Sequence, residues 1–334
     1  MIISKTPYRI SFFGGGSDYP DWYLRNGGEV ISSSINKYIY ISCRNLPPFF
    51  KHRYRIVYSK IEHVKDLKNI SHQAFREALR LFKKRIRFNS GLEIHYDGDL
   101  PAKSGMGSSS AFVVGLLNLL NNFFLKKNLS KKDLTTESLF LEQQILKEMV
   151  GSQDQTIASY GGFNSIKFFR SGNIKVTPII KNPNILEDFG SRFFLVFTGI
   201  KRTASHIAKT YVKKLDNIKR GSILEILQHV EIAKKLLNNN NFDDFGLLLN
   251  ETWKIKKSLS SSVSTYGVNS IYNKGMKNGA IGGKLLGAGG GGFFLFYVPK
   301  DNKNFFIKKM KNFVVIPVEF ENYGSQIIFN TNKS

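Results

Sequence analysis

The sequence has few cysteines and few acidic residues for its length. Its 334 residues include a single cysteine, Cys43, so no internal disulfide can form, and a reducing cytoplasm is the expected compartment. No apolar run approaches the ~20 residues that span a bilayer. The first residues lack the apolar core of a signal peptide. We therefore expect a cytoplasmic protein with no membrane partner.

Acidic residues are scarce relative to basic ones. The chain has 49 Lys and Arg against 25 Asp and Glu, which gives a formal net charge of +24. Such a charge is typical of proteins that bind a nucleic-acid backbone. The lysines, however, are spread along the whole chain. A solvated basic surface that attracts an anionic substrate is the favoured interpretation, and we expect no nucleic-acid partner.

Strand and helix patterns are mixed in both halves of the chain. Runs rich in β-branched and aromatic residues predict strands, and apolar residues at helical spacing predict helices. The predicted strands include Tyr8–Phe13, Glu29–Ser33 and Tyr38–Ser42, and the predicted helices include Ser71–Lys84, Ser109–Lys126 and Glu137–Val150. At about 100–200 residues per domain, the chain is long enough for two. The pattern predicts an α+β fold with domains at residues 1–178 and 179–334.

A stretch rich in glycine and serine stands between a predicted strand and a predicted helix. Its sequence is SGMGSSSAF, residues 104–112. Gly105 and Gly107 would let successive backbone N–H groups converge on one point, and the start of a helix adds unpaired N–H donors. The stretch predicts an anion-binding loop. Taken alone, a turn with a serine N-cap explains it better.

Several common catalytic patterns are missing. The residues around Lys284 do not form a P-loop. The glycines at 287, 289 and 292 precede a strand-like run, where a dinucleotide fingerprint requires a helix. The pattern G-x-S-x-G is absent around residues 104–112, which argues against a nucleophile elbow there. The six histidines and one cysteine show no transition-metal spacing.

Three separated stretches together resemble the GHMP kinases, the family of galactokinase, homoserine kinase, mevalonate kinase and phosphomevalonate kinase. They are PYRISFFGGGSDY at residues 7–19, PAKSGMGSSSA at residues 101–111 and KLLGAGGGGF at residues 284–293. Their order and spacing are those of the family, so the resemblance covers essentially the whole chain. It implies a two-domain fold with the active site in the cleft between the domains, ATP as the phosphate donor and Mg²⁺ as a cofactor.

Within the family, the sequence is most similar to kinases that phosphorylate the anomeric hydroxyl of a heptose 7-phosphate for surface polysaccharide synthesis. The similarity rests on residues 14–20, 150–155 and 198–205. One alternative is another sugar 1-kinase, of the fucose or galactose type. An alternative of a different class is a non-catalytic, basic RNA-binding protein. The implied partners are a sugar phosphate and ATP, and the sequence does not indicate an oligomeric state.

The resemblance also assigns roles to individual residues. Asp154 is expected to accept the proton of the sugar hydroxyl, with Arg9 facing it. Ser109 and Glu142 are expected to bind Mg²⁺, with Gln143 as the alternative to Glu142. The residues expected to bind ATP are Lys103, Ser104, Gly105, Met106, Gly107, Ser108, Ser109 and Ser110. Those expected to bind the acceptor are Gly14, Gly15, Gly16, Ser17, Asp18, Arg202, Thr203, Gly289 and Gly290. Asp154 as a helix cap and Glu142 as a solvated helix residue are the ordinary structural interpretations.

Overall fold

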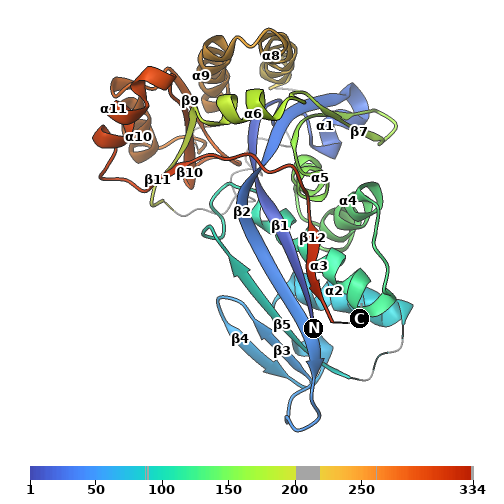
Figure 1. Cartoon of the computed structure of the whole chain (residues 1–334). Helices are drawn as coiled ribbons and strands as arrows, with labels where there is room; N and C mark the ends of the chain where they lie inside the picture. Colours follow the sequence, from blue (N-terminus) through green and yellow to red (C-terminus); the bar gives the residue numbers. More distant parts are fainter. Residues whose placement is uncertain (87, 89, 201–218, 261, 332–334) are drawn as a thin grey trace.

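The chain forms two β-sheets with helices packed against them, as the predicted α+β fold requires. The computed structural model describes residues 1–331 apart from residues 87, 89, 201–218 and 261 (Figure 1). Strands and helices are mixed in both halves of this described part.

The larger sheet has eight strands and is built mainly from the N-terminal half of the chain. Its two long central strands, β1 (Ile2–Phe13) and β2 (Gly28–Leu46), pair in antiparallel fashion. The other strands of this sheet are β3 (Tyr54–Val57), β4 (Ile61–Val64), β5 (Gly91–Gly98), β6 (Phe163–Phe168), β7 (Ile174–Pro178) and β12 (Gln326–Asn330). The strand β12 lies beside β1 although it comes from the C-terminal part of the chain (Figure 1).

The smaller sheet has four strands in the order β11-β8-β10-β9, and every pair is antiparallel. These strands are β8 (Phe193–Phe197), β9 (Gly282–Leu285), β10 (Phe293–Tyr297) and β11 (Val315–Pro317). Because β12 belongs to the larger sheet, the two sheets do not follow a single division of the chain. The boundary between residues 178 and 179 therefore stays a prediction.

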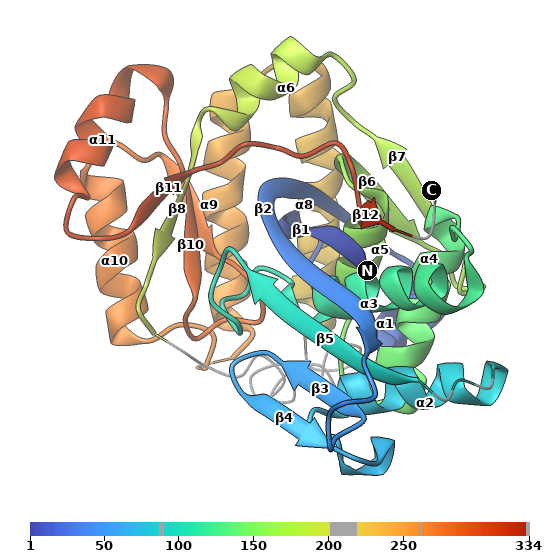
Figure 2. The ribbon, with the colours of Figure 1, turned by 60° about the horizontal axis from the view of Figure 1, so that its bottom comes forward.

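The helices fall into two groups. Those from the N-terminal part are α1 (Pro20–Asn26), α2 (Gln73–Arg85), α3 (Ser108–Leu125), α4 (Lys131–Leu139), a π-helix at Phe140–Ile145, and α5 (Gln153–Tyr160). The later ones are α6 (Pro183–Gly190), α8 (Arg220–Asn238), α9 (Phe242–Ser258), α10 (Tyr266–Lys277) and α11 (Lys303–Lys309). In Figure 2, α9 and α8 stand between the smaller sheet and β6.

The helix α3 is the centre of the N-terminal core. It is long and apolar enough to cross a membrane by length and composition, yet 72% of it is buried inside the protein. It packs against β1, β2 and α5. This packing fixes the position of its first turn, which follows the glycine- and serine-rich stretch.

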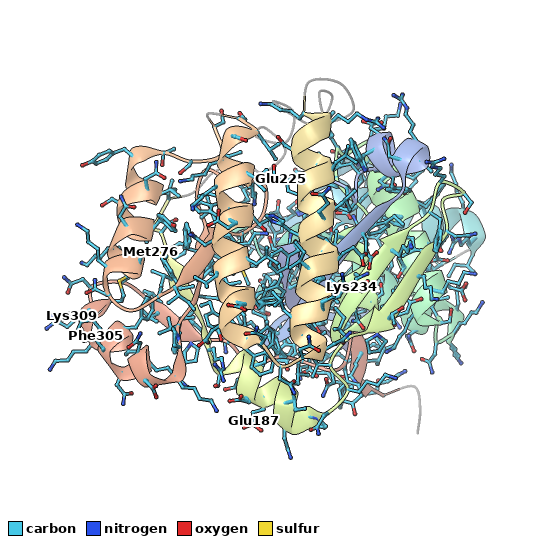
Figure 3. The ribbon with its side chains drawn as sticks, turned by 90° about the horizontal axis from the view of Figure 1, so that it is seen from above. Glu187, Glu225, Lys234, Met276, Phe305 and Lys309 are labelled. Atoms are coloured by element: carbon cyan, nitrogen blue, oxygen red, sulfur yellow. The ribbon has the colours of Figure 1, made fainter. Side chains whose placement is uncertain are left out.

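The helices α8 and α9 join the two halves of the molecule. They pack against each other, and α8 also contacts β1 and β2. Figure 3 shows Lys234 on the side of α8 that faces the larger sheet. Its Nζ lies 2.8 Å from a carboxylate oxygen of Glu29 in β2. An ion pair therefore links the C-terminal helices to the larger sheet.

Two predicted elements differ from the observed ones. The runs Glu29–Ser33 and Tyr38–Ser42 are one continuous strand, because β1 pairs with Ser34 and Tyr38 on either side of a register shift and Ile35 bridges Phe320. The predicted helix Glu137–Val150 is also wrong in its second half. Helical structure there ends with the π-helix, and Lys147 has a φ of +53°, which interrupts helical hydrogen bonding.

Candidate active site

A cleft of about 480 Å³ is lined by residues from both halves of the chain. The N-terminal half contributes residues of β1, the loop before α3, the first turn of α3 and the start of α5. The C-terminal half contributes residues of α8 and α9, together with Lys284, Gly287 and Ala288. Many of the predicted site residues lie in this cleft.

The glycine- and serine-rich stretch forms a loop that leads into α3. Gly107 is the N-cap of this helix and has a left-handed backbone, with φ +72° and ψ +23°, which glycine adopts without strain. Ser108, Ser109 and Ser110 occupy the first turn and line the cleft. The unpaired N–H groups of a helix start attract anions. The loop can therefore hold phosphate groups, as its sequence predicts.

This loop is held in place by its own buried residues and by a contact with the C-terminal half of the chain. Ser104 and Met106 are buried beneath it and do not line the cleft. A Cβ on Gly105 would lie 2.6 Å from the carbonyl oxygen of Leu286, so the loop touches the glycine-rich segment of the C-terminal half. The two segments that the sequence analysis singled out separately are thus in direct contact.

Arg9 and Asp154 form a two-bonded ion pair beside this loop. Arg9 Nε and Nη2 each donate a hydrogen bond of 2.7 Å to one carboxylate oxygen of Asp154. Arg9 Nη1 donates to the carbonyl oxygen of Gly105, also at 2.7 Å. The Asp154 side chain is 23% exposed and faces the cleft. The structure therefore brings together the predicted catalytic pair and the phosphate loop.

Asp18 lies near Asp154 on the same wall of the cleft. Its Oδ1 accepts a hydrogen bond of 3.0 Å from the backbone N–H of Gly16. Burial, together with the negative charge of Asp154, raises the pKa of Asp18 to about 6. Gly15 and Gly16 also line the cleft, whereas Gly14 and Ser17 are packed against the backbone of Glu29.

Glu142 lies behind the first turn of α3. Its carboxylate is fully buried and accepts hydrogen bonds from Gln155 and, at 3.2 Å, from Ser110. The structure thus places Ser110, not its predicted partner Ser109, against this carboxylate. Ser109 is exposed at the cleft. Burial raises the pKa of Glu142 to about 8.

Ser109 and Ser110 line the cleft and Glu142 does not, so a magnesium ion completed by phosphate oxygens would be held at the serine hydroxyls with the Glu142 carboxylate behind them. Within the described ranges, no group of three or more His, Cys, Asp or Glu residues forms a metal site by itself. Mg²⁺ in kinases typically takes one or two protein oxygens, with phosphates and water as its other ligands. Glu142 has no ion-pair partner within the described part of the chain. A nearby cation would favour its charged form.

The remaining predicted residues lie at the edge of the site or beyond it. Gly289 and Gly290 pack against Val263 instead of lining the cleft. Arg202 and Thr203 lie outside the described residues. Gln143 donates hydrogen bonds to the Val150 carbonyl and the Ser152 hydroxyl.

Two lysines of the C-terminal half line the site and were not predicted from the sequence. Lys256 and Lys284 line the cleft from the C-terminal half. A signal for Lys256 was present, because it shares the apolar face of α9 with Leu249, Thr252 and Trp253 at helical spacing. A lysine on the buried face of a helix requires an explanation.

Comparisons with known proteins agree with this geometry. Residues 73–162 match the model of the GHMP kinases N-terminal domain, and residues 233–316 match the model of the GHMP kinases C-terminal domain. The chain therefore belongs to the GHMP kinase family and is a phosphotransferase with an alcohol group as acceptor. ATP is the phosphate donor of this family.

The chain is similar to sugar kinases over nearly its whole length. It is 28% identical to the D-glycero-alpha-D-manno-heptose 7-phosphate kinase of Campylobacter jejuni, over 93% of both chains. It is 27% identical to the L-fucokinase/L-fucose-1-P guanylyltransferase of Bacteroides fragilis, over 90% of this chain and 35% of that protein. Its fold matches that of a D-glycero-D-manno-heptose 1-phosphate kinase from Bacteroides thetaiotaomicron with a TM-score of 0.80, 23% identity and 99% coverage of both chains.

Proposed function

We propose that the protein transfers the γ-phosphoryl group of ATP to the anomeric hydroxyl of D-glycero-D-manno-heptose 7-phosphate. The product is the 1,7-bisphosphate, a precursor for nucleotide-activated heptose. The observation that carries the proposal is the Arg9–Asp154 pair between the phosphate loop and Asp18. Similarity over 93% of both chains to a heptose 7-phosphate kinase supports this choice of acceptor.

The phosphate loop binds the donor in this proposal. Residues 103–110 surround its phosphates with backbone N–H groups and serine hydroxyls, and the start of α3 favours negative charge there. Ser109 and Glu142 hold Mg²⁺, with Ser110 fixing the Glu142 carboxylate. When bound, the ion neutralises charge on the phosphate oxygens.

Asp154 accepts the proton of the anomeric hydroxyl as the oxygen bonds to phosphorus. Arg9 keeps the Asp154 carboxylate in place and stabilises charge that develops on the acceptor oxygen. Because the transition state of phosphoryl transfer is loose, positioning contributes most of the acceleration and proton transfer comes late. Gln153 supports the carboxylate by donating a hydrogen bond of 3.1 Å to Asp154 Oδ1.

Asp18 binds hydroxyl groups of the sugar in this proposal, and Gly15 and Gly16 offer backbone groups at close approach. Arg202 and Thr203 contribute from the C-terminal half. Gly14, Ser17, Gly289 and Gly290 shape the loops around the acceptor. The protein works in the cytoplasm, with no nucleic-acid or membrane partner.

The test measures kcat/KM with D-glycero-D-manno-heptose 7-phosphate, the unphosphorylated heptose, fucose and galactose. We expect the phosphorylated heptose to be preferred at least tenfold, with phosphorus NMR placing the new phosphate on C1. The preference shrinks with added salt to the extent that the +24 charge steers the anionic acceptor. Equal use of both heptoses, or a preference for fucose or galactose, would contradict the assigned acceptor.

A further inference from the structure

Lys256 and Lys284 bring positive charge to the cleft from the C-terminal half of the chain. Lys256 Nζ donates hydrogen bonds to the carbonyl oxygens of Leu285, at 3.0 Å, and Gly287. Lys284 Nζ donates to the carbonyl oxygen of Phe12 at 2.7 Å. An ammonium group has three N–H donors, so two carbonyls hold the Lys256 group in place and leave one donor for a ligand.

Neither lysine is neutralised by an acidic side chain. In the described part of the chain, their hydrogen bonds go to backbone carbonyls, and neither forms an ion pair. Burial and the positive charge of Arg9 lower the pKa of Lys256 to about 7. A buried charge without a partner is unfavourable. An anionic ligand would remove this cost.

The charges of the residues that line the cleft also favour an anionic ligand. Five of its described lining residues are basic and three are acidic. One of the acids, Asp154, is already bound to Arg9 through both oxygens. The cleft thus retains positive charge beyond what its own carboxylates compensate, in addition to the N–H groups of the phosphate loop.

The position of Lys256 separates it from the other lysines of the cleft. Lys103 and Lys147 are exposed and belong to segments next to the phosphate loop and the π-helix. Lys256 projects from α9 and donates to the Leu285 carbonyl beside Lys284, whose Nζ donates to the carbonyl of Phe12, two residues before Gly14. It therefore lies on the side of the cleft assigned to the acceptor.

We propose that Lys256 binds the phosphate group that the acceptor already carries, and that Lys284 strengthens the positive field at this position. This inference rests on the proposed function, which supplies an acceptor with its own phosphate. The ligand chemistry is a terminal, dianionic phosphoryl group. It could also come from the γ-phosphate of ATP, and the experiment separates the two sources.

The test compares Lys256→Met with Lys254→Met, which alters an exposed lysine of the same helix that pairs with Glu251. We expect Lys256→Met to lower kcat/KM for heptose 7-phosphate about ten- to a hundredfold, the effect of one charged hydrogen bond. In Lys256→Met we expect the rate with unphosphorylated heptose and the KM for ATP to stay within about twofold of their wild-type values. The Lys254→Met enzyme behaves like the wild type.

An equal loss with both heptoses, or a raised KM for ATP, would assign Lys256 to the donor and overturn the proposal. Melting curves check folding, and Lys256→Gln serves as a second variant.

Calorimetric titration with inorganic phosphate, at a saturating concentration of a non-hydrolysable ATP analogue and Mg²⁺, tests the same site without turnover. We expect binding to wild type and Lys254→Met and at least tenfold weaker binding to Lys256→Met. Equal binding to all three overturns the phosphate site. No turnover of either heptose by wild type overturns the proposed function alone.

Discussion

Both carboxylate oxygens of Asp154 accept hydrogen bonds from Arg9. This geometry holds the carboxylate in place and aimed at the cleft, where it can accept a proton. An asparagine at position 154 keeps the size of the side chain, and its amide oxygen still accepts one of the two hydrogen bonds from Arg9, so we expect the fold to survive this change. The chemistry of this residue can thus be tested apart from its structural role.

We expect Asp154→Asn to fold and bind ATP but to lose about 10²–10⁴-fold in kcat, the usual contribution of a general base. Steady-state kinetics and a nucleotide titration measure the two properties. Asp301→Asn is the control, since Asp301 is an exposed carboxylate far along the chain. Turnover near the wild-type rate in Asp154→Asn would exclude Asp154 as the base.

The sequence was most informative for single residues that lie within a motif. Arg9, Asp18 and Asp154 were predicted as site residues, and the structure places all three at one cleft. Lys256 was not predicted, because it stands in a helix without a motif and its neighbours in the cleft come from a distant segment. Ser110 was predicted to bind ATP but not to contact Glu142, since a serine run gives no indication of which hydroxyl turns inward.

At the scale of elements, the loop before α3 depends on backbone conformations that glycine provides. Gly107 has a positive φ, and a Cβ there would lie 3.0 Å from Arg9 Cγ and 3.3 Å from Asp154 Oδ2. A side chain at this position would therefore strain the loop and press on the catalytic pair at once. The loop before α3 and the Arg9–Asp154 pair thus meet at one residue.

We expect Gly107→Ala to lower the free energy of unfolding by about 1–2 kcal/mol, the cost of a left-handed conformation. It should also lower kcat/KM for ATP about tenfold or more, because small displacements of reacting groups are costly. Gly221→Ala in α8 is the matched control, since a Cβ there meets nothing within 4 Å. Denaturant unfolding and kinetics report both effects, and equal behaviour of the two variants would contradict this account.

Elements were predictable where local pattern decides them. The helices α2 and α3 lie within a few residues of their predicted ranges, because their apolar spacing is regular. The continuous strand β2 was not predicted, because past Ser34 it is held by a bridge from Ile35 to Phe320 and by renewed pairing with β1 at Tyr38, which its own residues do not indicate. The end of the π-helix at Ile145 depends on the positive φ of Lys147, which no residue preference indicates.

On the scale of the whole molecule, the buried lysines link stability to pH. The pKa values of Lys256 and Lys284 are lowered by burial, to about 7 for Lys256. Above pH 7 the unfolded chain therefore holds protons that the folded protein has released. The stability of the ligand-free protein accordingly gains a contribution that rises with pH from about 7 towards the ordinary lysine value of 10.5.

We expect the unfolding free energy of wild type, minus that of Lys256→Met, to increase between pH 7 and 9. For Lys256 alone the slope is at most about 1.4 kcal/mol per pH unit, the limit for one proton. Denaturant unfolding of both proteins without nucleotide measures the difference, in which groups that do not interact with Lys256 cancel; Lys284, whose pKa is lowered by the charge of Lys256, adds to it. A difference that is constant or falls with pH would show that Lys256 keeps an ordinary pKa.

The overall architecture was predictable only in class. Mixed helix and strand patterns and the three motifs indicated an α+β kinase, and the family comparisons confirm it. The return of residues 326–330 to the larger sheet was not predicted, because that pairing depends on contacts between opposite ends of the described chain.

That return has a consequence for how the protein is made. Ile2 pairs with Asn330, so one edge of β1 lacks its neighbour until residue 330 has left the ribosome. Throughout synthesis, the nascent chain exposes unpaired N–H and C=O groups at this edge, which other strands can bind. The larger sheet is therefore completed only after all its other strands have been made, and this edge of β1 stays open longest.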